Sequence, residues 1–498
     1  MQNLPNNPKL YEINTRVWLR RFDTPARPAT LEHVPLSVWD ELAGKGINIV
    51  WLMGVWKLNP SVVEKYSLTD ELVRGYRRAL PDWRREDVIG SPYAVDSYSI
   101  SSYVGNLESL QALRNTLHQR GMRLMLDFVP NHFSADSHLI HTHPEHFLQG
   151  NNALLQRDPK TFYRPQNNPQ NKELIFAHGR DPYFPAWTDS VQVNYFNPDA
   201  RRFMSDTLLQ LAQVCDGVRC DMAMLILNDI FANTWREAAA EMNYQIPQQE
   251  FWPQAIQQVK KQYPQFIFMA EAYWDKEWSL QQQGFDYTYD KKLLDRLRSG
   301  DVAAVLGHLR AEPEYQAHSV RFLENHDEDR AVAALGTERS LAAAVIISTI
   351  PGLRFYHDGQ FEGKHIQLPI QLGREPAEPP QQDILDYYQK LLAVTKECIF
   401  DDGHWQLLSA APAWVGSDSY LNILTWLWQY EDQRRLVVVN FSDKISQCRV
   451  QIEISGRGEQ LEFLDLLAER VYRISRQEFN ASGLSIELGP YQSHIFTF

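Results

Sequence analysis

The sequence contains little cysteine, only four residues in 498, and no two of them form a C-x-x-C pair. Disulfide-stapled extracellular folds and cysteine-based zinc sites use paired or regularly spaced cysteines, so the pattern argues against both classes. Cys220 lies within an apolar run, and we interpret the four cysteines as reduced thiols of the core. Free thiols of this kind are typical of a cytoplasmic protein.

Long apolar runs are also absent. No uninterrupted stretch approaches the ~18 residues that a membrane-spanning helix needs. Residues 1–14 (MQNLPNNPKLYEIN) contain neither the basic start nor the apolar centre of a secretory signal. We therefore expect no membrane association and no secretion.

Positive charge is in deficit, since the formal net charge is −13. This balance argues against nucleic acid or an anionic membrane as a partner. The remaining composition, 44% hydrophobic and 22% charged, is that of an ordinary globular protein, long enough for a large barrel with a smaller domain. Aromatic residues make up 12%, which suits a large core or a protein that stacks ring faces on sugars.

Short apolar runs recur along the first 360 residues and alternate with amphipathic stretches. In residues 106–121, for example, leucines recur at helical spacing before a closing Gly121. Continuous apolar strands are typical of parallel strands covered on both faces, so eight such units predict an α/β fold, a (β/α)8 TIM barrel. The predicted strands are residues 11–19, 47–54, 122–130, 217–224, 266–274, 285–290, 319–327 and 352–359.

Two connections between these strands are too long for simple crossovers. Residues 55–90 are charged and irregular, whereas residues 133–196, after the third strand, are rich in His, Asn, Gln and Pro and predict an excursion domain on the catalytic rim. Residues 446–454 alternate apolar and polar side chains, as antiparallel strands do. We predict a barrel of residues 1–132 and 197–398, an excursion (B) domain of residues 133–196, and a C-terminal antiparallel β-sandwich of residues 399–498.

Charged side chains gather where four of the predicted strands end. In a (β/α)8 barrel the active site lies at the C-terminal ends of the strands, so these side chains should converge on one mouth. A lone Arg-x-Asp pair on one strand face is commonly a structural ion pair, but four acids, one arginine and two histidines at one mouth predict catalysis. The residues are Asp127, His132, Arg219, Asp221, Glu271, His326 and Asp327.

Four ordered motifs carry a resemblance to a known family. DFVPNH (127–132), GVRCD (217–221), AEAYW (270–274) and ENHDE (324–328) resemble the ordered motifs of glycoside hydrolase family 13, the α-amylase family, and QVNYFNPDAR (192–201) resembles its short motif near the end of the excursion domain. The family pattern is a barrel, an insertion after the third strand and a C-terminal β-sandwich, so the resemblance covers essentially the whole chain.

The resemblance implies a role for each matching residue. Asp221 would be the nucleophile, Glu271 the general acid and then the general base, and Asp327 the group that orients the sugar and stabilises the transition state. Arg219 would hold Asp221 ionised and aimed. The implied substrate-binding residues are Arg219, His132, His326, Tyr93 and Asp127.

Physical chemistry supports this division of roles. Retaining glycosidases need two carboxyl groups about 5–5.5 Å apart, one ionised and one protonated. Arg219 shares a strand face with Asp221 and should lower the pKa of that carboxyl, whereas burial and a neighbouring carboxylate should raise the pKa of Glu271. We interpret Asp127 and Asn131 as braces of the loop after the third strand.

The chain departs from the family pattern at two places. α-Amylases of the family commonly carry Lys-His where this chain has Met224 and Leu225, so polar contacts beyond the cleavage point should be missing. Gln192 stands where the family often has an aspartate that helps to bind structural calcium, and an amide is a weaker calcium ligand. We therefore expect neither a standard starch-cleaving α-amylase nor the calcium site of the family.

Four histidines in HLIHTHPEHF (138–147) could indicate a zinc site or a polar rim loop. We favour the rim loop, because no cysteine or acidic cluster completes a ligand set, and we predict no metal and no cofactor.

We predict a retaining α-glycosidase that hydrolyses α-glucosidic bonds in oligosaccharides, α-glucans or small glucosides through a covalent glycosyl-enzyme. A transglycosylase or glycoside phosphorylase on the same scaffold is the first alternative, and a non-catalytic sugar-binding protein is the second. The expected partner is a carbohydrate, and the sequence leaves the oligomeric state open.

Overall fold

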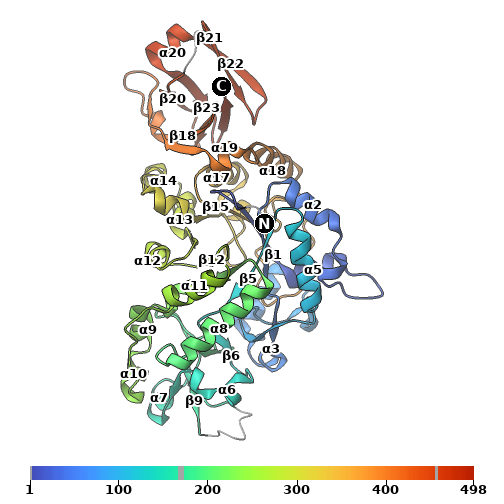
Figure 1. Ribbon diagram of the computed structural model, residues 1–498. Coiled ribbons are helices and arrows are strands. Elements are labelled where there is room, and N and C mark those ends of the chain that lie inside the picture. The colour runs from blue at the N-terminus through green and yellow to red at the C-terminus, as the bar shows by residue number, and fades with distance from the viewer. Residues whose placement is uncertain (1–2, 166–172, 455–457) are drawn as a thin grey trace.

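The computed structural model describes residues 3–165, 173–454 and 458–498 (Figure 1). Eight parallel strands close into a barrel in the order β1-β15-β14-β13-β12-β11-β5-β2. Each strand overlaps one of the eight apolar runs, which confirms the predicted (β/α)8 barrel. The strands are β1 (Lys9–Asn14), β2 (Ile49–Met53), β5 (Arg123–Phe128), β11 (Gly217–Cys220), β12 (Ile267–Ala270), β13 (Tyr287–Tyr289), β14 (Ser319–Arg321) and β15 (Leu353–His357).

Several strands end earlier than the sequence predicts. β11 stops at Cys220, because Met222 adopts a left-handed backbone with φ 43° that breaks the ladder before the 3-10 turn η5 (Ala223–Ile226). β12 stops at Ala270, one residue before Glu271. The polar side chains that follow are therefore carried by loops at the barrel mouth.

Helices cover the outside of the barrel, as the alternating pattern requires. The predicted helix of residues 106–121 is α5 (Leu107–His118). Asn106 caps its N-terminus, since the Asn106 side chain accepts a hydrogen bond of 2.8 Å from the Ser109 N–H. The other barrel helices are α2 (Leu36–Gly44), α8 (Pro198–Val214), α11 (Phe251–Gln262), α12 (Glu277–Gln282), α13 (Lys291–Ser299), α14 (Val302–Leu309), α17 (Thr337–Thr349) and α18 (Gln382–Thr395). Shorter helices in the connections are α1 (Thr15–Trp18), α9 (Asn228–Thr234), α10 (Arg236–Met242), α15 (Pro313–Ala317), α16 (Ala331–Leu335) and α19 (Cys398–Asp402).

The connection after β2 is more ordered than its composition suggests. The prediction that residues 55–90 are irregular is wrong, because this segment forms α3 (Pro60–Tyr66) and α4 (Asp70–Ala79). Their apolar side chains pack into a small separate core around the buried Tyr76. Strand β3 (Trp56–Leu58) then pairs with β4 (Val95–Ile100) in an antiparallel ribbon.

The chain leaves the barrel after β5 and returns at α8, and the segment between them lies at one end of the molecule in Figure 1. Of the predicted excursion domain, residues 166–172 lie outside the described residues. The rest holds two small antiparallel sheets, of orders β10-β6 and β7-β9-β8, with two short helices. Its elements are β6 (His132–Ser134), α6 (Leu139–Thr142), β7 (Gln149–Gly150), α7 (Asn152–Arg157), β8 (Phe162–Tyr163), β9 (Ile175–Ala177) and β10 (Ser190–Gln192).

At the opposite end of Figure 1 the C-terminal segment forms two antiparallel sheets, of orders β16-β18-β19-β24-β21-β22 and β17-β20-β23, as predicted. Side chains from both sheets share one apolar core. Trp428 joins this segment to the barrel, since its indole N–H donates to the Thr349 carbonyl at 2.6 Å. The elements are β16 (His404–Leu407), β17 (Ala410–Pro412), β18 (Ile423–Tyr430), β19 (Gln433–Asn440), β20 (Ser446–Val450), β21 (Gln460–Asp465), β22 (Arg470–Ser475), α20 (Arg476–Ser482), β23 (Leu484–Leu488) and β24 (Ser493–Thr497).

All four cysteines are free, and three of them are buried as predicted. The prediction is wrong for Cys398, which is exposed at the first position of α19. Within the residues that the structure describes, none of the helices combines the length and the apolar character that a bilayer crossing demands.

Candidate active site

The candidate site is built around one buried arginine at the barrel mouth. β11 and β12 are neighbours, and their register places Asp221 and Glu271 at adjacent strand ends. Arg219 is 0% exposed, and its Nη1 donates to Asp221 Oδ1 at 2.6 Å while its Nη2 lies 2.9 Å from Glu271 Oε2. The sequence predicted a pair with Asp221 alone, whereas the structure places both carboxylates on the same guanidinium.

Aromatic rings enclose this guanidinium. Trp51, Tyr93 and Tyr289 lie with their ring centres 5.2–5.6 Å from the guanidinium carbon of Arg219. Cations over aromatic faces are stabilised by the ring quadrupole. The rings also keep water away, so the charges in this site interact at low effective dielectric.

Two further donors fix the Glu271 carboxylate. The backbone N–H of Met222 donates to Oε2 at 2.6 Å, and the Tyr273 hydroxyl donates to Oε1 at 3.0 Å. The left-handed backbone of Met222 aims this N–H at the carboxylate. Strained backbone of this kind persists where the surroundings hold it, often at functional sites.

Burial raises the pKa of Glu271 to about 7, and the Asp221 and Asp327 carboxylates add to this rise while Arg219 opposes it. The direction predicted for Glu271 is therefore confirmed. A carboxyl group with such a pKa can both donate and accept a proton near neutral pH.

Arg219 lowers the pKa of Asp221 as predicted, but it does not set the net direction. Burial raises the pKa of Asp221 above its ordinary value, and the charge and the hydrogen bond of Arg219 only oppose this rise. The physical reason is that desolvation of the buried carboxylate, to which the nearby Asp327 carboxylate adds, outweighs the stabilisation that Arg219 provides.

A second cluster surrounds His326. Its Nε2 lies 3.0 Å from Asp327 Oδ2 and 2.7 Å from the Tyr93 hydroxyl, and the Tyr93 ring stacks on the imidazole at 5.4 Å. Burial alone would lower the pKa of His326, but the Asp327 and Glu12 carboxylates raise it well above its ordinary value. The Asp327 side chain is 45% exposed; its partial burial would raise its pKa, but the charge and hydrogen bond of His326 lower it below the ordinary value. The pair therefore holds Asp327 ionised.

Sequence reasoning missed Glu12. This residue lies on β1, is fully buried, and accepts from His326 Nδ1 at 2.5 Å while its other oxygen lies 2.7 Å from His357 Nδ1. Burial alone would raise the pKa of Glu12, but the two histidines lower it below its ordinary value. Two features of the sequence could have indicated this contact: Glu12 is a carboxylate inside an apolar barrel strand, and His357 lies near the end of the eighth predicted strand.

The other predicted residues lie around the same mouth. Asp127 Oδ2 accepts from the Gly54 N–H at 3.1 Å, which ties β5 to the residue after β2, and burial raises the pKa of Asp127 to about 7. His132 is buried at the start of β6, where burial lowers its pKa to about 4. Its ring centre lies 5.3 Å from that of Trp187.

Gln192 lies against Asn131. Its amide Nε2 donates to the Asn131 carbonyl at 2.7 Å and to the Asn131 side-chain oxygen at 3.0 Å. An N–H group therefore faces oxygens that would otherwise be available to a hard cation such as calcium.

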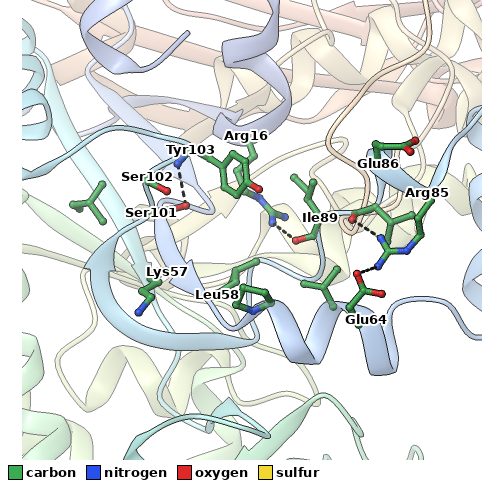
Figure 2. A pocket seen from close by; sticks show the side chains of 14 residues that line it. Arg16, Lys57, Leu58, Glu64, Arg85, Glu86, Ile89, Ser101, Ser102 and Tyr103 are labelled. Carbon is green, nitrogen blue, oxygen red and sulfur yellow. Dashed lines mark hydrogen bonds and ion pairs between the residues drawn. The ribbon is translucent and has the colours of Figure 1, made fainter. Parts of the chain in front are cut away.

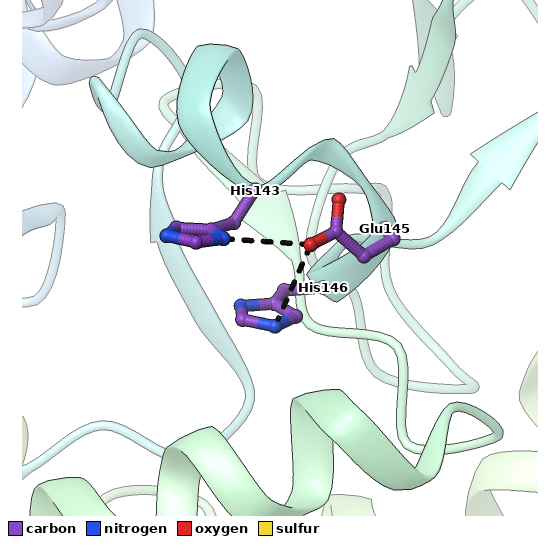
Figure 3. Close-up of side chains that lie close together, drawn as sticks. All are labelled: His143, Glu145 and His146. Atoms are coloured by element: carbon purple, nitrogen blue, oxygen red, sulfur yellow. Dashed lines mark hydrogen bonds and ion pairs between the residues drawn. The ribbon is translucent and has the colours of Figure 1, made fainter.

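Of the four histidines in residues 138–147, two lie together with Glu145 (Figure 3). His143 Nδ1 and His146 Nε2 lie 3.4 and 3.9 Å from Glu145 Oε1, and the two rings stack in nearly parallel planes, 9° apart. Imidazole binds a metal through an in-plane lone pair, and stacked rings cannot both direct such a pair at one ion. The arrangement thus supports the rim-loop interpretation.

A separate cavity of about 720 Å³ lies between α3 and the loop residues 101–103 (Figure 2). None of Asp221, Glu271 and Asp327 lines it. Arg16, on its wall, donates to the carbonyls of Gly90 and Ile370 at 3.0 and 2.9 Å. It thereby supports the loop that leads to Tyr93, and the cavity contributes no group to the mouth.

Comparison with known proteins agrees with this geometry. Residues 91–368 match the family model of the α-amylase catalytic domain. The chain is 24% identical over 364 residues to the α-amylase MalA of Haloarcula japonica (71% of this chain, 44% of that protein) and 22% identical over 342 residues to an intracellular maltogenic amylase of Bacillus subtilis (63% and 51%). It spans about half the length of the curated relatives it matches.

Solved structures are similar over the whole chain. A maltogenic α-amylase, AmyB, from Thermotoga neapolitana superposes with a TM-score of 0.69 at 20% identity, and an α-amylase from Lactobacillus plantarum with 0.68 at 19%. Each alignment covers 99% of both chains. At these identities the likeness concerns the fold.

Proposed function

The chain belongs to the α-amylase family of glycoside hydrolases, and from this membership we propose that it is a retaining α-glycosidase that hydrolyses α-glucosidic bonds in oligosaccharides or small glucosides. The observation that carries the proposal is the buried Arg219 guanidinium bound to both Asp221 and Glu271. Two carboxyl groups held side by side at a barrel mouth are the equipment of this reaction.

In the first step the Asp221 carboxylate attacks the anomeric carbon of the bound glucosyl unit. The bond from that carbon to the glycosidic oxygen breaks, and Glu271 transfers its proton to the leaving oxygen. The product is an ester between Asp221 and the sugar. Arg219 stabilises the Asp221 carboxylate before attack and faces the Glu271 carboxylate after its proton has left.

In the second step Glu271, now ionised, removes a proton from water while the water oxygen attacks the anomeric carbon. The ester bond breaks and Asp221 leaves as a carboxylate. A pKa of about 7 for Glu271 suits both steps, because the group must be protonated in the first and ionised in the second.

The other residues of the mouth bind and orient the sugar. Asp327, held ionised by His326, accepts hydroxyl hydrogen bonds and opposes the positive charge that develops on the ring. Tyr93 offers a ring face and His132 a ring nitrogen, and His326 acts through Asp327 and the Tyr93 hydroxyl, which its Nε2 contacts. Glu12 positions His326 through its hydrogen bond to Nδ1, and Asp127 holds the backbone of Gly54.

The domain boundaries and the cellular location belong to the same proposal. We assign the barrel to residues 1–132 and 197–398, the excursion domain to 133–196 and the β-sandwich to 399–498. A cytoplasmic location is supported by the free cysteines and by the similarity to an intracellular maltogenic amylase of Bacillus subtilis.

The test of the proposal distinguishes the role of Asp221 from that of Glu271. Asp221→Asn should lose activity with every leaving group, whereas Glu271→Gln should lose it with maltose and retain the first step with a dinitrophenyl α-glucoside, whose leaving group needs no proton. Removal of an acid–base group typically costs about 10²–10⁴-fold. We expect a phenolate burst in Glu271→Gln and a mass gain of one hexose on the peptide that contains Asp221.

Glu237→Gln, the same change at a 70% exposed carboxylate side chain on α10, is the matched control and should behave as the native chain. A burst in Asp221→Asn, or a label on Glu271 or Asp327, would refute these roles.

A further inference from the structure

The cavity between α3 and residues 101–103 takes no part in the proposed reaction (Figure 2). One of its walls is α3, which lies in the segment of residues 55–90, and this segment has a core of its own around Tyr76. Protein interiors are packed so closely that voids larger than a water molecule are few. Pockets for small ligands have volumes of about 300–1,000 Å³, and the 720 Å³ of this cavity lie within that range.

The wall of the cavity offers a large apolar surface in a fixed position. Its apolar side chains include Leu58, Val63, Val88, Ile89 and Ile100. α3 touches the opposite side closely, because a side chain added at Gly90 would come within 2.6 Å of Val63 Cγ2. Tyr103 also lines the cavity and is 71% exposed, so its ring can cover the apolar body of a bound molecule.

Arg16 is the buried charge of this wall, with an exposed fraction of 6%. Its two terminal nitrogens donate to the carbonyls of Gly90 and Ile370. Its Nε has no hydrogen-bond partner, and among the described residues no carboxylate forms an ion pair with it. Burial accordingly lowers the pKa of Arg16 to about 10. A buried charge without a counter-charge costs stability, and in a cavity such a group marks a candidate ligand site.

The other charged side chains on the wall do not neutralise Arg16. Three of the four are held in ion pairs, and the fourth is exposed to solvent, where water and salt screen its charge. They are Lys57 (paired with Asp96), Glu64 and Arg85 (paired with each other) and the exposed Glu86. The cavity therefore has an uncompensated positive charge beside an apolar surface.

We infer that this cavity is a second ligand site, which takes a small organic anion whose acid group binds Arg16 and whose apolar body lies against Val63 and Ile100. The acid group is a carboxylate or a phosphate, because a guanidinium donates charge-assisted hydrogen bonds to both. Such a ligand supplies the counter-charge that Arg16 lacks. The site is separate from the barrel mouth, and the inference does not depend on the proposed function.

The experiment compares three probes that share a phenyl ring: benzoate, phenyl phosphate and the neutral benzamide. Binding of each probe to the native chain is measured by isothermal titration calorimetry. A hydrogen bond between charged groups is stronger than one to a neutral group, so at least one of the two anions should bind about tenfold or more tightly than benzamide. The anion that binds more tightly identifies the acid group as a carboxylate or a phosphate.

Two variants locate the bound anion. Arg16→Gln removes the charge and should reduce the affinity for the anion to that for benzamide. Because Arg16 also holds backbone carbonyls, Ser102→Trp is the second variant, which fills the cavity from an exposed position on its wall and should abolish binding of all three probes. Ser485→Trp, the same change at an exposed serine on β23, is the matched control and should bind the probes as the native chain does.

Equal affinity for the three probes, or no binding of either anion, would overturn the inference. Binding of an anion that stays unchanged in Ser102→Trp, with the native unfolding midpoint retained, would place the anion elsewhere on the molecule and would overturn the site as well. The titration needs no turnover of substrate, so a failure of this site and a failure of the proposed function are distinguishable.

Discussion

The hydrogen bond from Tyr273 to Glu271 leads to a quantitative prediction about pH. Glu271 must carry its proton when the leaving oxygen departs, so kcat/KM should fall as pH rises through the pKa of this residue, about 7. Tyr273 donates to the ionised form at 3.0 Å and therefore holds the pKa down. Tyr273→Phe removes this donor, so the alkaline limb of the profile of kcat/KM against pH should move to higher pH.

The size of the shift follows from the strength of the contact. A hydrogen bond to a charged group contributes about 1.5–3 kcal/mol, and one to the neutral carboxyl about 0.5–1.5 kcal/mol. The difference, about 1 kcal/mol, corresponds to roughly 0.7 of a pH unit at about 1.36 kcal/mol per unit. Because Arg219 and the Met222 N–H remain, the carboxyl stays fixed and the shift should appear without a loss of the site.

The assay is kcat/KM for maltose from pH 5 to 9 in the native chain and in Tyr273→Phe. Tyr103→Phe, at a tyrosine that is 71% exposed, is the matched control and should leave the limb in place. An alkaline limb that stays fixed or moves to lower pH in Tyr273→Phe would refute Glu271 as the group whose protonation limits the first step.

Three further predictions concern stability and substrate size. Because the Gln192 amide N–H faces the Asn131 oxygens, prolonged chelation should leave activity and Tm unchanged, and a Tm drop that calcium restores would contradict this. Glu12→Gln leaves His326 and His357 without their shared buried carboxylate and should cost about 3–5 kcal/mol of stability, measured by denaturant unfolding; an unchanged midpoint would show that the network is dispensable. The buried Met224 and Leu225 offer a long substrate no polar contact, so maltotriose should be turned over better than starch, and a rapid loss of starch viscosity with few new reducing ends would contradict this.

The sequence was sufficient to predict the barrel, because each parallel strand buried on both faces must be an apolar run between helices. It also predicted which residues meet. In a closed parallel barrel the C-terminal ends of all strands lie at one mouth, so Asp221, Glu271 and Asp327 converge whatever the details of packing.

Sequence patterns predicted helices, strand ends and burial wrongly where the local composition fits more than one structure. Residues 55–90 appeared irregular because their charges obscure the apolar faces of α3 and α4. Strand ends were placed too late because the apolar runs continue into the loops, and β11 is ended by the left-handed backbone of Met222. Cys398 proved exposed because it begins a helix at the surface.

Tertiary structure alone decided the electrostatics of the site. Glu12 and His326 are 314 residues apart and yet share a hydrogen bond, and no spacing along the chain indicates such a contact. Arg219 serves two carboxylates because β11 and β12 are adjacent. Desolvation depends on everything that packs around a group, so it raises the pKa of Asp221 against the direction that its neighbouring arginine suggests.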